Sequence, residues 1–271
     1  MSDHSLPDTS YHSRGDEMLG DVEVSRGYQQ NAQYWEHIVR ERLDKFQTEV
    51  TDVALLDLIG DCSGAQVVDA GCGEGYFTRE LIGRGAAHVH GVDTCAELIV
   101  AARAHPENGG RHADYHHADV ADLPLRDASV DIVVANRLPH GIADPAGRFR
   151  EFRRVLRPTG RLIVLSMHPC FYAARADREG IGFASTIDDY FGVRTVQQRF
   201  SVAGLTSPVE SFQQFYSLEE HIGMITAAGF AMTSLREPRP STEQRRTDEF
   251  WATNFTRPLF MLLECTTVSA D

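Results

Sequence analysis

The sequence predicts an α/β protein with a doubly wound, mostly parallel sheet, and three observations support this fold class. Nearly continuous apolar runs, such as VDIVVAN at 130–136 and RLIVLSM at 161–167, are typical of strands that are buried on both faces. Segments of about ten to fifteen residues with helical periodicity separate such runs. A glycine-rich turn, VVDAGCGEGYFTREL at 67–81, joins the first strand to a helix.

The chain ahead of this strand divides into three parts. Residues 1–20 are rich in Ser, Asp, His and Gly and lack periodicity, so we expect a disordered or loosely held arm. Residues 21–44 hold several aromatic side chains and are expected to form an N-terminal helical cap. The main domain is expected at 45–271 and opens with a helix at 45–59, which Gly60 ends.

The main domain alternates strands and helices. The crossovers between its parallel strands should be right-handed. We expect five strands at 67–68, 88–92, 115–118, 130–136 and 161–167, with helices at 75–84, 95–104 and 145–157.

Residues 168–216 interrupt this alternation. They place many aromatic residues among Gly, Asp and Arg, so we expect a lid-like insertion after the fifth strand. The pattern then returns with a helix at 217–228, a strand at 230–236 and a last strand at 258–265.

Composition and charge disfavour some classes of binding partner. The chain has 271 residues, 42% of them hydrophobic, and a net charge of −13. That charge disfavours nucleic acid, because no basic stripe offsets it. No apolar run approaches the roughly 18 residues of a membrane span, and the polar N-terminus is unlike a secretory signal. Five cysteines without a CxxC pair indicate reduced thiols and a cytoplasmic protein.

The glycine-rich turn carries the strongest chemical signal. Glycines at 71, 73 and 75 allow positive φ angles and close approach of a ligand to the backbone. The following helix offers amide groups and a partial positive charge. The spacing differs from the G-x-G-x-x-G of dinucleotide sites. Asp69, two residues before the first glycine, would repel a pyrophosphate and suits the ammonium of an amino-acid-like ligand.

This turn, DAGCGEG, resembles the first motif of class I S-adenosylmethionine-dependent methyltransferases. The similarity continues through HGVDTC, HHADVADLPLRDASVDIVVANRLPH and FREFRRVLRPTGRLIVLSMHP; in the last, Thr159 stands where the family often has Gly. The resemblance implies a Rossmann-like seven-stranded sheet with an antiparallel last strand, and S-adenosyl-L-methionine as cofactor.

The resemblance also implies which residues hold the cofactor. Asp93 would bind the ribose hydroxyls, and Asp119 would read the adenine amino group with Val120 beside the ring. The N-terminal segment of the family folds over the cofactor. The expected cofactor residues are Asp69, Gly71, Cys72, Gly73, Gly75, Asp93, Thr94, Asp119, Val120, Asn136, Tyr28 and Tyr34.

Methyl transfer from a sulfonium is an in-line displacement, so alignment of donor and acceptor is the main task. A base is required only for a nucleophile that is protonated at neutral pH, such as a phenol with a pKa of about 10. His140 and His168 follow two strands at their carboxyl ends and are the candidate catalytic residues. The family often reads L-H-H-I-x-D where this chain has Leu138-Pro139-His140, so the first histidine is missing. His168 could instead be a turn residue beside Pro169.

The acceptor is expected to contact aromatic residues of the cap and the insertion. Arg137 could hold an acidic acceptor or the cofactor carboxylate, or form a surface salt bridge. The expected substrate-binding residues are Trp35, Arg137, Phe171, Tyr172 and Phe212. No metal site is predicted, because the adjacent His116 and His117 point to opposite faces of a strand.

These features predict methyl transfer to a small, aromatic-containing molecule in biosynthesis, by a monomer or homodimer. The methylated atom is left open as O, N or C. One alternative is an enzyme of the same fold that uses the bound sulfonium for a non-methylating reaction such as cyclisation. The other is a methyltransferase for protein or RNA.

Overall fold

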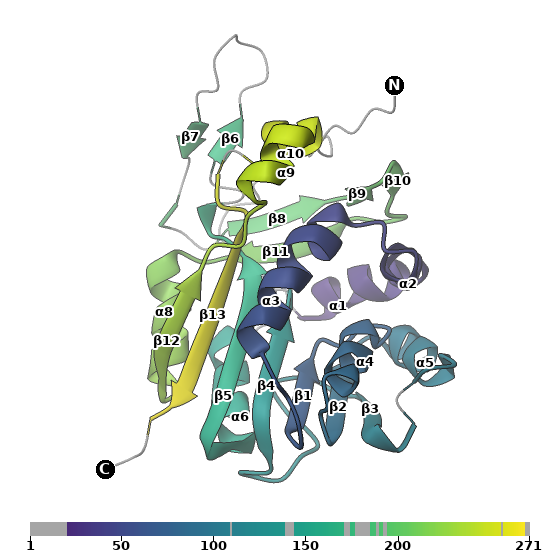
Figure 1. Ribbon diagram of the computed structural model, residues 1–271, viewed down its shortest axis with the longest axis vertical. Helices are drawn as coiled ribbons and strands as arrows, with labels where there is room; N and C mark the ends of the chain where they lie inside the picture. Colours follow the sequence, from purple (N-terminus) through teal and green to yellow (C-terminus); the bar gives the residue numbers. More distant parts are fainter. Residues whose placement is uncertain are drawn as a thin grey trace.

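Strand β1 (Gln66–Ala70) lies inside a seven-stranded sheet with the order β12-β13-β5-β4-β1-β2-β3 (Figure 1). The computed structural model describes residues 21–108, 110–138, 144–170, 174–176, 185–187, 190–191, 194–255 and 257–268. The expected arm at 1–20 lies outside these residues, as do His140, Phe171 and Tyr172. The other strands of the sheet are β2 (His88–Asp93), β3 (Ala113–His117), β4 (Val130–Asn136), β5 (Leu156–Met167), β12 (Phe230–Arg236) and β13 (Phe260–Thr267).

The sheet confirms the doubly wound α/β fold. Strands β1 to β5 pair in parallel, and β13 runs antiparallel to both β5 and β12. The parallel strands therefore end along one edge, at Ala70, Asp93, His117, Asn136 and Met167. Chain reversals at this edge gather the polar side chains that follow each strand.

Helices cover both faces of the sheet (Figure 1). One face packs on α6 (Pro145–Val155) and α8 (Leu218–Ala227). The other packs on α3 (Asp52–Ile59), α4 (Tyr76–Gly83) and α10 (Glu249–Asn254). Helix α5 (Ala96–Ala104) contacts β2 and β3. The η1 segment (Gln47–Thr51), a π-helix, precedes α3, and the 3-10 turn η2 (Gly110–His112) precedes β3.

The cap and the insertion meet over the carboxyl edge of the sheet. The cap contains α1 (Asp21–Gln30) and α2 (Ala32–Arg40). The described residues of the insertion form three antiparallel ribbons, β6 (Ala174–Ala176) with β7 (Ser185–Ile187), β8 (Arg194–Gln198) with β11 (Ser211–Phe215), and β9 (Ser201–Val202) with β10 (Leu205–Thr206).

Asn31, which is fully buried between α1 and α2, joins these two parts. Its Nδ2 donates to the backbone oxygen of Val209 at 3.0 Å and to Oγ of Ser211 at 3.1 Å, and its Oδ1 accepts from the Val209 amide at 3.0 Å. Gly27 lies so close to β11 that a Cβ there would be 3.0 Å from the oxygen of Glu210. The cap and the β8–β11 ribbon therefore pack as a unit.

Two segments differ from the sequence expectation. The helix expected at 145–157 ends at Val155, because the chain turns extended and Leu156 pairs with Val130 before a register shift brings Arg161 opposite Ile132. The segment between β12 and β13, for which the sequence predicted no helix, contains α9 (Thr242–Thr247) and α10. A capping box of Ser241 and Gln244 begins α9.

Within the described part of the chain, no helix has the length and apolar character that a membrane span requires.

Candidate functional site

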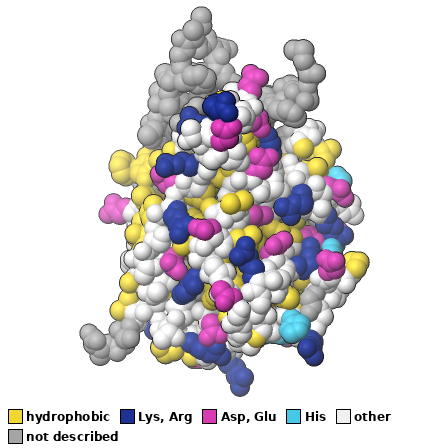
Figure 2. All heavy atoms as spheres, viewed as in Figure 1, with side chains coloured by type: hydrophobic (Ala, Val, Ile, Leu, Met, Phe, Trp, Pro, Cys, Tyr) yellow, Lys and Arg dark blue, Asp and Glu magenta, His cyan; other side chains and the backbone are white. Residues whose placement is uncertain are grey.

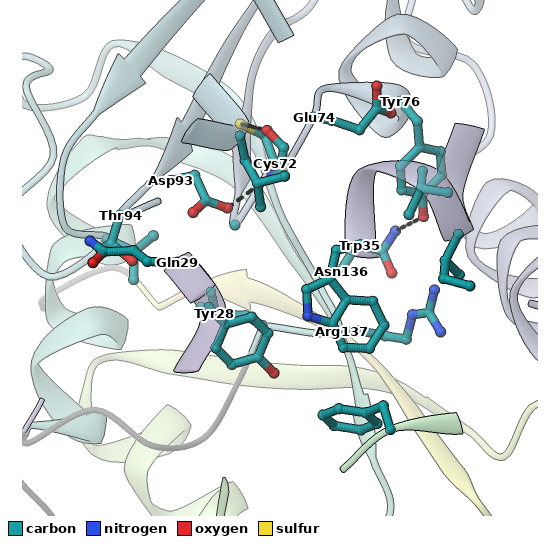
Figure 3. Close-up of a pocket in the computed structure, with 18 of the residues that line it drawn as sticks. Tyr28, Gln29, Trp35, Cys72, Glu74, Tyr76, Asp93, Thr94, Asn136 and Arg137 are labelled. Atoms are coloured by element: carbon teal, nitrogen blue, oxygen red, sulfur yellow. Dashed lines mark hydrogen bonds between the residues drawn. The ribbon is translucent and has the colours of Figure 1, made fainter. Parts of the chain in front are cut away.

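A cavity of about 690 Å³ lies at the carboxyl edge of the sheet. Its walls come from the turns after β1, β2 and β4, from α1 and α2, and from the insertion. Figure 3 shows Asp93, Thr94 and Gln29 on one side of it and Tyr76, Asn136 and Arg137 on the other. Its volume lies in the range of about 300–1,000 Å³ that is typical of small-molecule sites.

The three glycines of the turn after β1 have different surroundings. All have positive φ angles, +79° at Gly71, +55° at Gly73 and +85° at Gly75. A Cβ would meet Leu138 at 2.7 Å from Gly71 and the Tyr115 ring at 2.8 Å from Gly75. From Gly73, the nearest described atom would be Leu98 Cδ1 at 4.0 Å. Gly73 therefore borders open cavity, whereas Gly75 allows packing on Tyr115 and is not among the described residues that line the cavity.

The backbone amides of this turn bond within the protein. Those of Gly71 and Cys72 donate to the oxygen of Val92, at 2.8 and 3.0 Å, and that of Gly75 donates to the oxygen of Cys72 at 2.9 Å. The Gly73 amide donates to Oδ2 of Asp93 at 2.9 Å. These four amides precede α4 and donate within the protein, so they are not donors for a ligand. The turn offers a ligand a close-fitting backbone surface.

Asp93 ends β2 and lines the cavity. Its Oδ1 accepts from the Cys95 amide at 2.8 Å, and its Oδ2 from the Gly73 amide. Burial raises the pKa of this carboxyl. The side chain therefore links the glycine turn to the start of α5, and its remaining lone pairs are available to hydroxyl donors in the cavity.

Thr94, Asp119 and Val120 line the cavity beside Asp93, as does Cys72 of the glycine turn. Asp119 is exposed, and its Oδ1 accepts from the Ala121 amide at 2.8 Å. Val120 is 4% exposed and packs in the core. The four residues form the wall where the resemblance places the adenosine of the cofactor.

Asp69 lies beneath the glycine turn and is 1% exposed. Its Oδ2 accepts from the Thr78 hydroxyl at 2.7 Å, and its Oδ1 has no partner among the described residues. Asp69 is not among the described residues that line the cavity. It is thus placed to hold the start of α4 against β1, which differs from the expected contact with a ligand ammonium.

Asp69 should give the fold a specific pH dependence. Burial raises the pKa of its carboxyl to about 7, above the unfolded value of about 3.9. Its stabilising contribution is therefore complete below pH 4 and is lost as the pH rises through 7. We expect the unfolding free energy of Asp69→Asn, relative to the natural chain, to increase between pH 4 and 7. Urea unfolding across this range measures the difference; a constant difference would contradict the assignment.

The opposite end of the cavity holds a polar network. Nδ2 of Asn136 donates to the Tyr76 hydroxyl at 2.7 Å, which donates to Oδ1 of Asp52 at 3.2 Å. Nη1 of Arg137 pairs with Oδ2 of Asp44 at 2.7 Å. Burial raises the pKa of Asp52 to about 6, against the lowering effect of Arg137.

Arg137 lies at the cavity and also forms an ion pair within the protein. It lines the cavity, and its ion pair with Asp44 leaves 25% of the arginine side chain exposed. Its φ is +54°, a conformation that non-glycine residues rarely adopt and that costs about 1 kcal/mol or more. The backbone amide of Arg137 donates to Leu165 at 2.8 Å. This bond fixes the strained residue at the end of β4.

Two buried polar atoms at this end of the cavity could bond to a ligand. Nε1 of Trp35 and Oδ1 of Asn136 have no hydrogen-bond partner among the described residues, although both residues line the cavity. One atom is a donor and the other an acceptor. Such atoms cost free energy unless a ligand or water satisfies them, so this end suits a molecule with both kinds of polar group.

Aromatic residues of the cap and the insertion cover the cavity. Tyr28, Trp35 and Phe200 line it, and the Trp35 and Phe200 rings meet edge to face with centroids 4.9 Å apart. Burial raises the pKa of Tyr28 to about 12, against the lowering effect of the Gln213 side chain, which also lines the cavity. Phe200 and Gln213 were not among the expected residues, because nothing in their local sequence distinguishes them from the rest of the insertion.

Two further expected residues lie elsewhere. The Tyr34 hydroxyl donates toward the oxygens of Phe200 and Leu205, at 3.4 and 3.3 Å, so this side chain holds the insertion and does not line the cavity of the described residues. Phe212 is also absent from that lining. It is adjacent to Gln213 on β11, and successive strand residues point to opposite faces.

His168 lies outside the cavity that the described residues form. Its Nδ1 accepts from the Cys170 amide at 3.1 Å, and its Nε2 is 3.4 Å from Oε1 of Glu237. It is 7% exposed, and burial lowers its pKa. This geometry favours the turn role. His140 remains an expectation, two residues beyond the cavity-lining Leu138.

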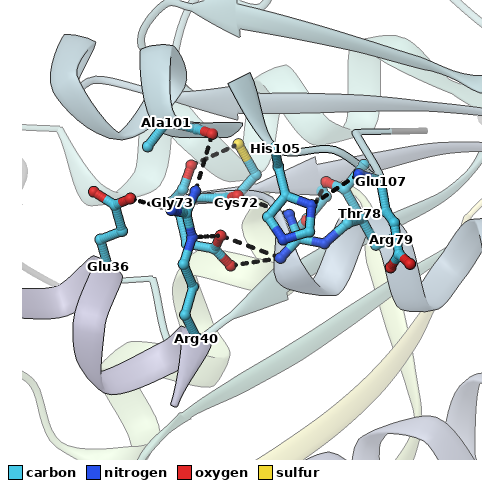
Figure 4. A network of polar contacts seen from close by, with 11 residues as sticks. Glu36, Arg40, Cys72, Gly73, Thr78, Arg79, Ala101, His105 and Glu107 are labelled. Atoms are coloured by element: carbon cyan, nitrogen blue, oxygen red, sulfur yellow. Dashed lines mark hydrogen bonds and ion pairs between the residues drawn. The ribbon is translucent and has the colours of Figure 1, made fainter. Parts of the chain in front are cut away.

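Glu74, in the glycine turn, was missed by the sequence analysis. It is 2% exposed and lines the cavity. Its carboxylate pairs with Arg40 of α2 at 3.1 Å and with Arg79 of α4 at 2.8 Å (Figure 4). Arg40 also donates to the oxygen of Ala101 at 3.1 Å. This network joins the cap to α4 and α5.

The sequence of this chain is similar to those of known proteins. A family model described as a methyltransferase domain matches residues 68–164. A probable S-adenosylmethionine-dependent methyltransferase of Mycolicibacterium smegmatis is 30% identical over 175 residues, which is 65% of this chain and 61% of that protein. A ubiquinone biosynthesis O-methyltransferase of Aromatoleum aromaticum is 29% identical over 119 residues, 44% of this chain and 50% of that protein. The chain thus spans less than two thirds of either relative.

A solved structure matches over a larger share. The S-adenosylmethionine-dependent methyltransferase from Mesorhizobium loti superimposes with a TM-score of 0.66 and 26% identity. The match covers 79% of this chain and 96% of that one.

Proposed function

Because the chain belongs to the class I S-adenosylmethionine-dependent methyltransferases, we propose that it methylates a small, aromatic-containing molecule. The proposal rests on one continuous cavity that runs from Gly73 and Asp93 to Trp35, Asn136 and Arg137. One end matches the cofactor residues of the family, and the other end has aromatic rings and a few polar anchors.

The residues present fit S-adenosylmethionine. The absence of a side chain at Gly73 leaves space that a Cβ would fill. Two backbone amides hold the Asp93 carboxylate in place, and this carboxylate could accept hydrogen bonds from the ribose hydroxyls. Asp119 and Val120 would hold the adenine, and Thr94 and Cys72 would border it. The amino-acid end of the cofactor would lie toward Tyr28, Trp35 and Asn136. When bound, the cofactor supplies an electrophilic methyl group on a sulfonium.

The chain's own contribution is alignment and exclusion of water. The cap and the β8–β11 ribbon cover the cavity, so an acceptor would be held between Phe200, Met167 and Trp35. Met167 and Phe200 provide apolar contact, whereas Arg137, Gln47 and Gln213 provide polar anchors for ring substituents. A proximity mechanism of this kind needs no metal and no covalent intermediate.

A small acceptor is favoured over a macromolecule by the size of the cavity, about 690 Å³, and by charge. The net charge is −13, and positive and negative side chains are interspersed on the face shown in Figure 2. Such a surface offers no continuous basic track for a phosphate backbone.

The test is an assay with labelled S-adenosylmethionine and a panel of phenols, catechols, aromatic amines and carbon acids. We expect one class of small aromatic acceptor to gain the mass of one CH₂ with stoichiometric S-adenosylhomocysteine. Conversion of a substrate without gain of mass would favour the cyclisation alternative. Methylation confined to protein or RNA would overturn the choice of acceptor and leave the cofactor assignment intact.

Substitution of the two candidate histidines distinguishes catalysis by alignment from catalysis by a general base. His168 lies outside the described cavity lining, so His168→Gln should lower kcat by tenfold or less, an order of magnitude below the roughly 10²- to 10⁴-fold contribution of a positioned base. His140→Ala is the comparison. A loss of tenfold or less in both variants indicates alignment alone, whereas a base-sized loss in His168→Gln alone would contradict its placement in the turn.

A further inference from the structure

Four polar side chains gather on one face of strands β2 and β3, away from the cavity. His88 and His90 alternate along β2, and Asp114 and His116 alternate along β3. Alternate strand residues point to the same face. The parallel register pairs His90 with Asp114, so the two pairs share one face of the sheet edge.

The side chains of this cluster make direct contact. Nε2 of His88 lies 3.1 Å from Oδ2 of Asp114, and Nδ1 of His90 lies 3.3 Å from Nε2 of His116. The rings of His88 and His90 have centroids 4.7 Å apart. One donor atom from each of His88, His90 and Asp114 lies within 4.8 Å of the other two.

We propose that His88, His90 and Asp114 bind one divalent transition-metal ion, with His116 as a positioning residue for His90. In a tetrahedral site with zinc–nitrogen distances of about 2.0–2.1 Å, neighbouring donor atoms are roughly 3.3 Å apart. The distance from His88 to Asp114 already has this size, and a small movement of His90 completes the set. Imidazole with one carboxylate suits zinc, nickel or copper and disfavours magnesium or calcium.

The role of His116 follows from the tautomers of a histidine pair. One of the two nitrogens that are 3.3 Å apart carries the hydrogen, and the other accepts it. With the hydrogen on Nδ1 of His90, Nε2 of that ring keeps the lone pair that a metal needs. A ligating histidine commonly donates its other N–H in this way to an outer partner.

The position of the cluster indicates what a bound ion would do. Strand β3 is one edge of the sheet, and among the described strands it pairs only with β2. An ion held by both strands would join them at the end opposite Asp93. Asp114, whose side chain is 62% exposed, leaves a route for the ion to enter. The site is therefore structural, and its metal takes no part in methyl transfer.

The experiment uses the full chain without an affinity tag, freed of metal by a chelator. Titration with ZnCl₂ in a calorimeter should show one site that Asp114→Asn and His90→Ala weaken strongly. His116→Ala should weaken it by about 10- to 100-fold, as expected for an outer partner. His37→Ala, which removes an exposed histidine on α2, is the matched control and should bind as the natural chain does. Magnesium should not compete.

Two further measurements keep the result interpretable if a histidine variant folds poorly. Asp114 is exposed, so Asp114→Asn should retain the fold, and its loss of zinc affinity is sufficient support. Cobalt in place of zinc should give the visible absorption of a tetrahedral site in the natural chain and not in Asp114→Asn. Equal zinc affinity in the natural chain and in folded Asp114→Asn and His90→Ala, or no saturable binding at all, would overturn the proposal.

Discussion

Asp93→Ala is expected to weaken the binding of S-adenosylhomocysteine by about 100-fold or more. The carboxylate would accept two hydrogen bonds from the ribose, and bonds to a charged group contribute about 1.5–3 kcal/mol each. The loss of two such bonds at the lower value corresponds to about two orders of magnitude in Kd. The same substitution frees the amides of Gly73 and Cys95, which loosens the turn that borders the cofactor.

Calorimetry with purified protein measures this change, with two comparison variants. Asp93→Asn keeps an acceptor and most of the volume, so its affinity should fall between those of the natural chain and Asp93→Ala. Asp57→Ala removes an exposed carboxylate on α3 that pairs with Arg236, and its affinity should be unchanged. Full affinity in a folded Asp93→Ala would show that the ribose lies elsewhere.

Glu74→Ala is expected to lower the unfolding free energy by about 3 kcal/mol, at the lower end of the range for breaking a buried ion pair. The variant leaves Arg40 and Arg79 without their shared carboxylate (Figure 4). The Arg79 side chain is 16% exposed and the Arg40 side chain is 33% exposed. Water therefore solvates the unpaired Arg40 guanidinium better than that of Arg79. Because Arg40 belongs to the cap, cofactor affinity should also fall.

Urea unfolding measures the loss of stability. Glu243→Ala breaks an exposed pair with Arg246 on α9, and its unfolding midpoint should match that of the natural chain. Glu74→Gln keeps the shape and loses the charge, so its stability should lie between those of the natural chain and Glu74→Ala. A Glu74→Ala variant as stable as Glu243→Ala would contradict the buried network.

The sheet and the glycine turn could be predicted from the sequence because their signals are local. Buried parallel strands appear as continuous apolar runs, as in β4 and β5. The positive φ angles of Gly71 and Gly73 are a property of glycine itself. Asp93 and Asp119 follow strands at the edge where ligands bind, and both line the cavity.

The cover of the cavity could not be predicted, because its contacts join distant parts of the chain. Asn31 binds Val209 and Ser211, 178 and 180 residues away, and no local pattern marks such a pair. His168 follows a strand, and this position correctly predicted that it lies at the carboxyl edge of the sheet. The direction of its ring depends on its contacts with Glu237 and Cys170. The cluster at His90 depends on the register between β2 and β3. The adjacency of His116 and His117 in the sequence gives no information about this register.

A crystal structure of the full chain with S-adenosylhomocysteine would locate the cofactor. We expect one ligand in the cavity, with its ribose bonded to Asp93, its adenine beside Val120 and Asp119, and its sulfur toward Trp35 and Asn136. A ligand bound outside this cavity, or a ribose that does not contact Asp93, would show that the cofactor site is elsewhere.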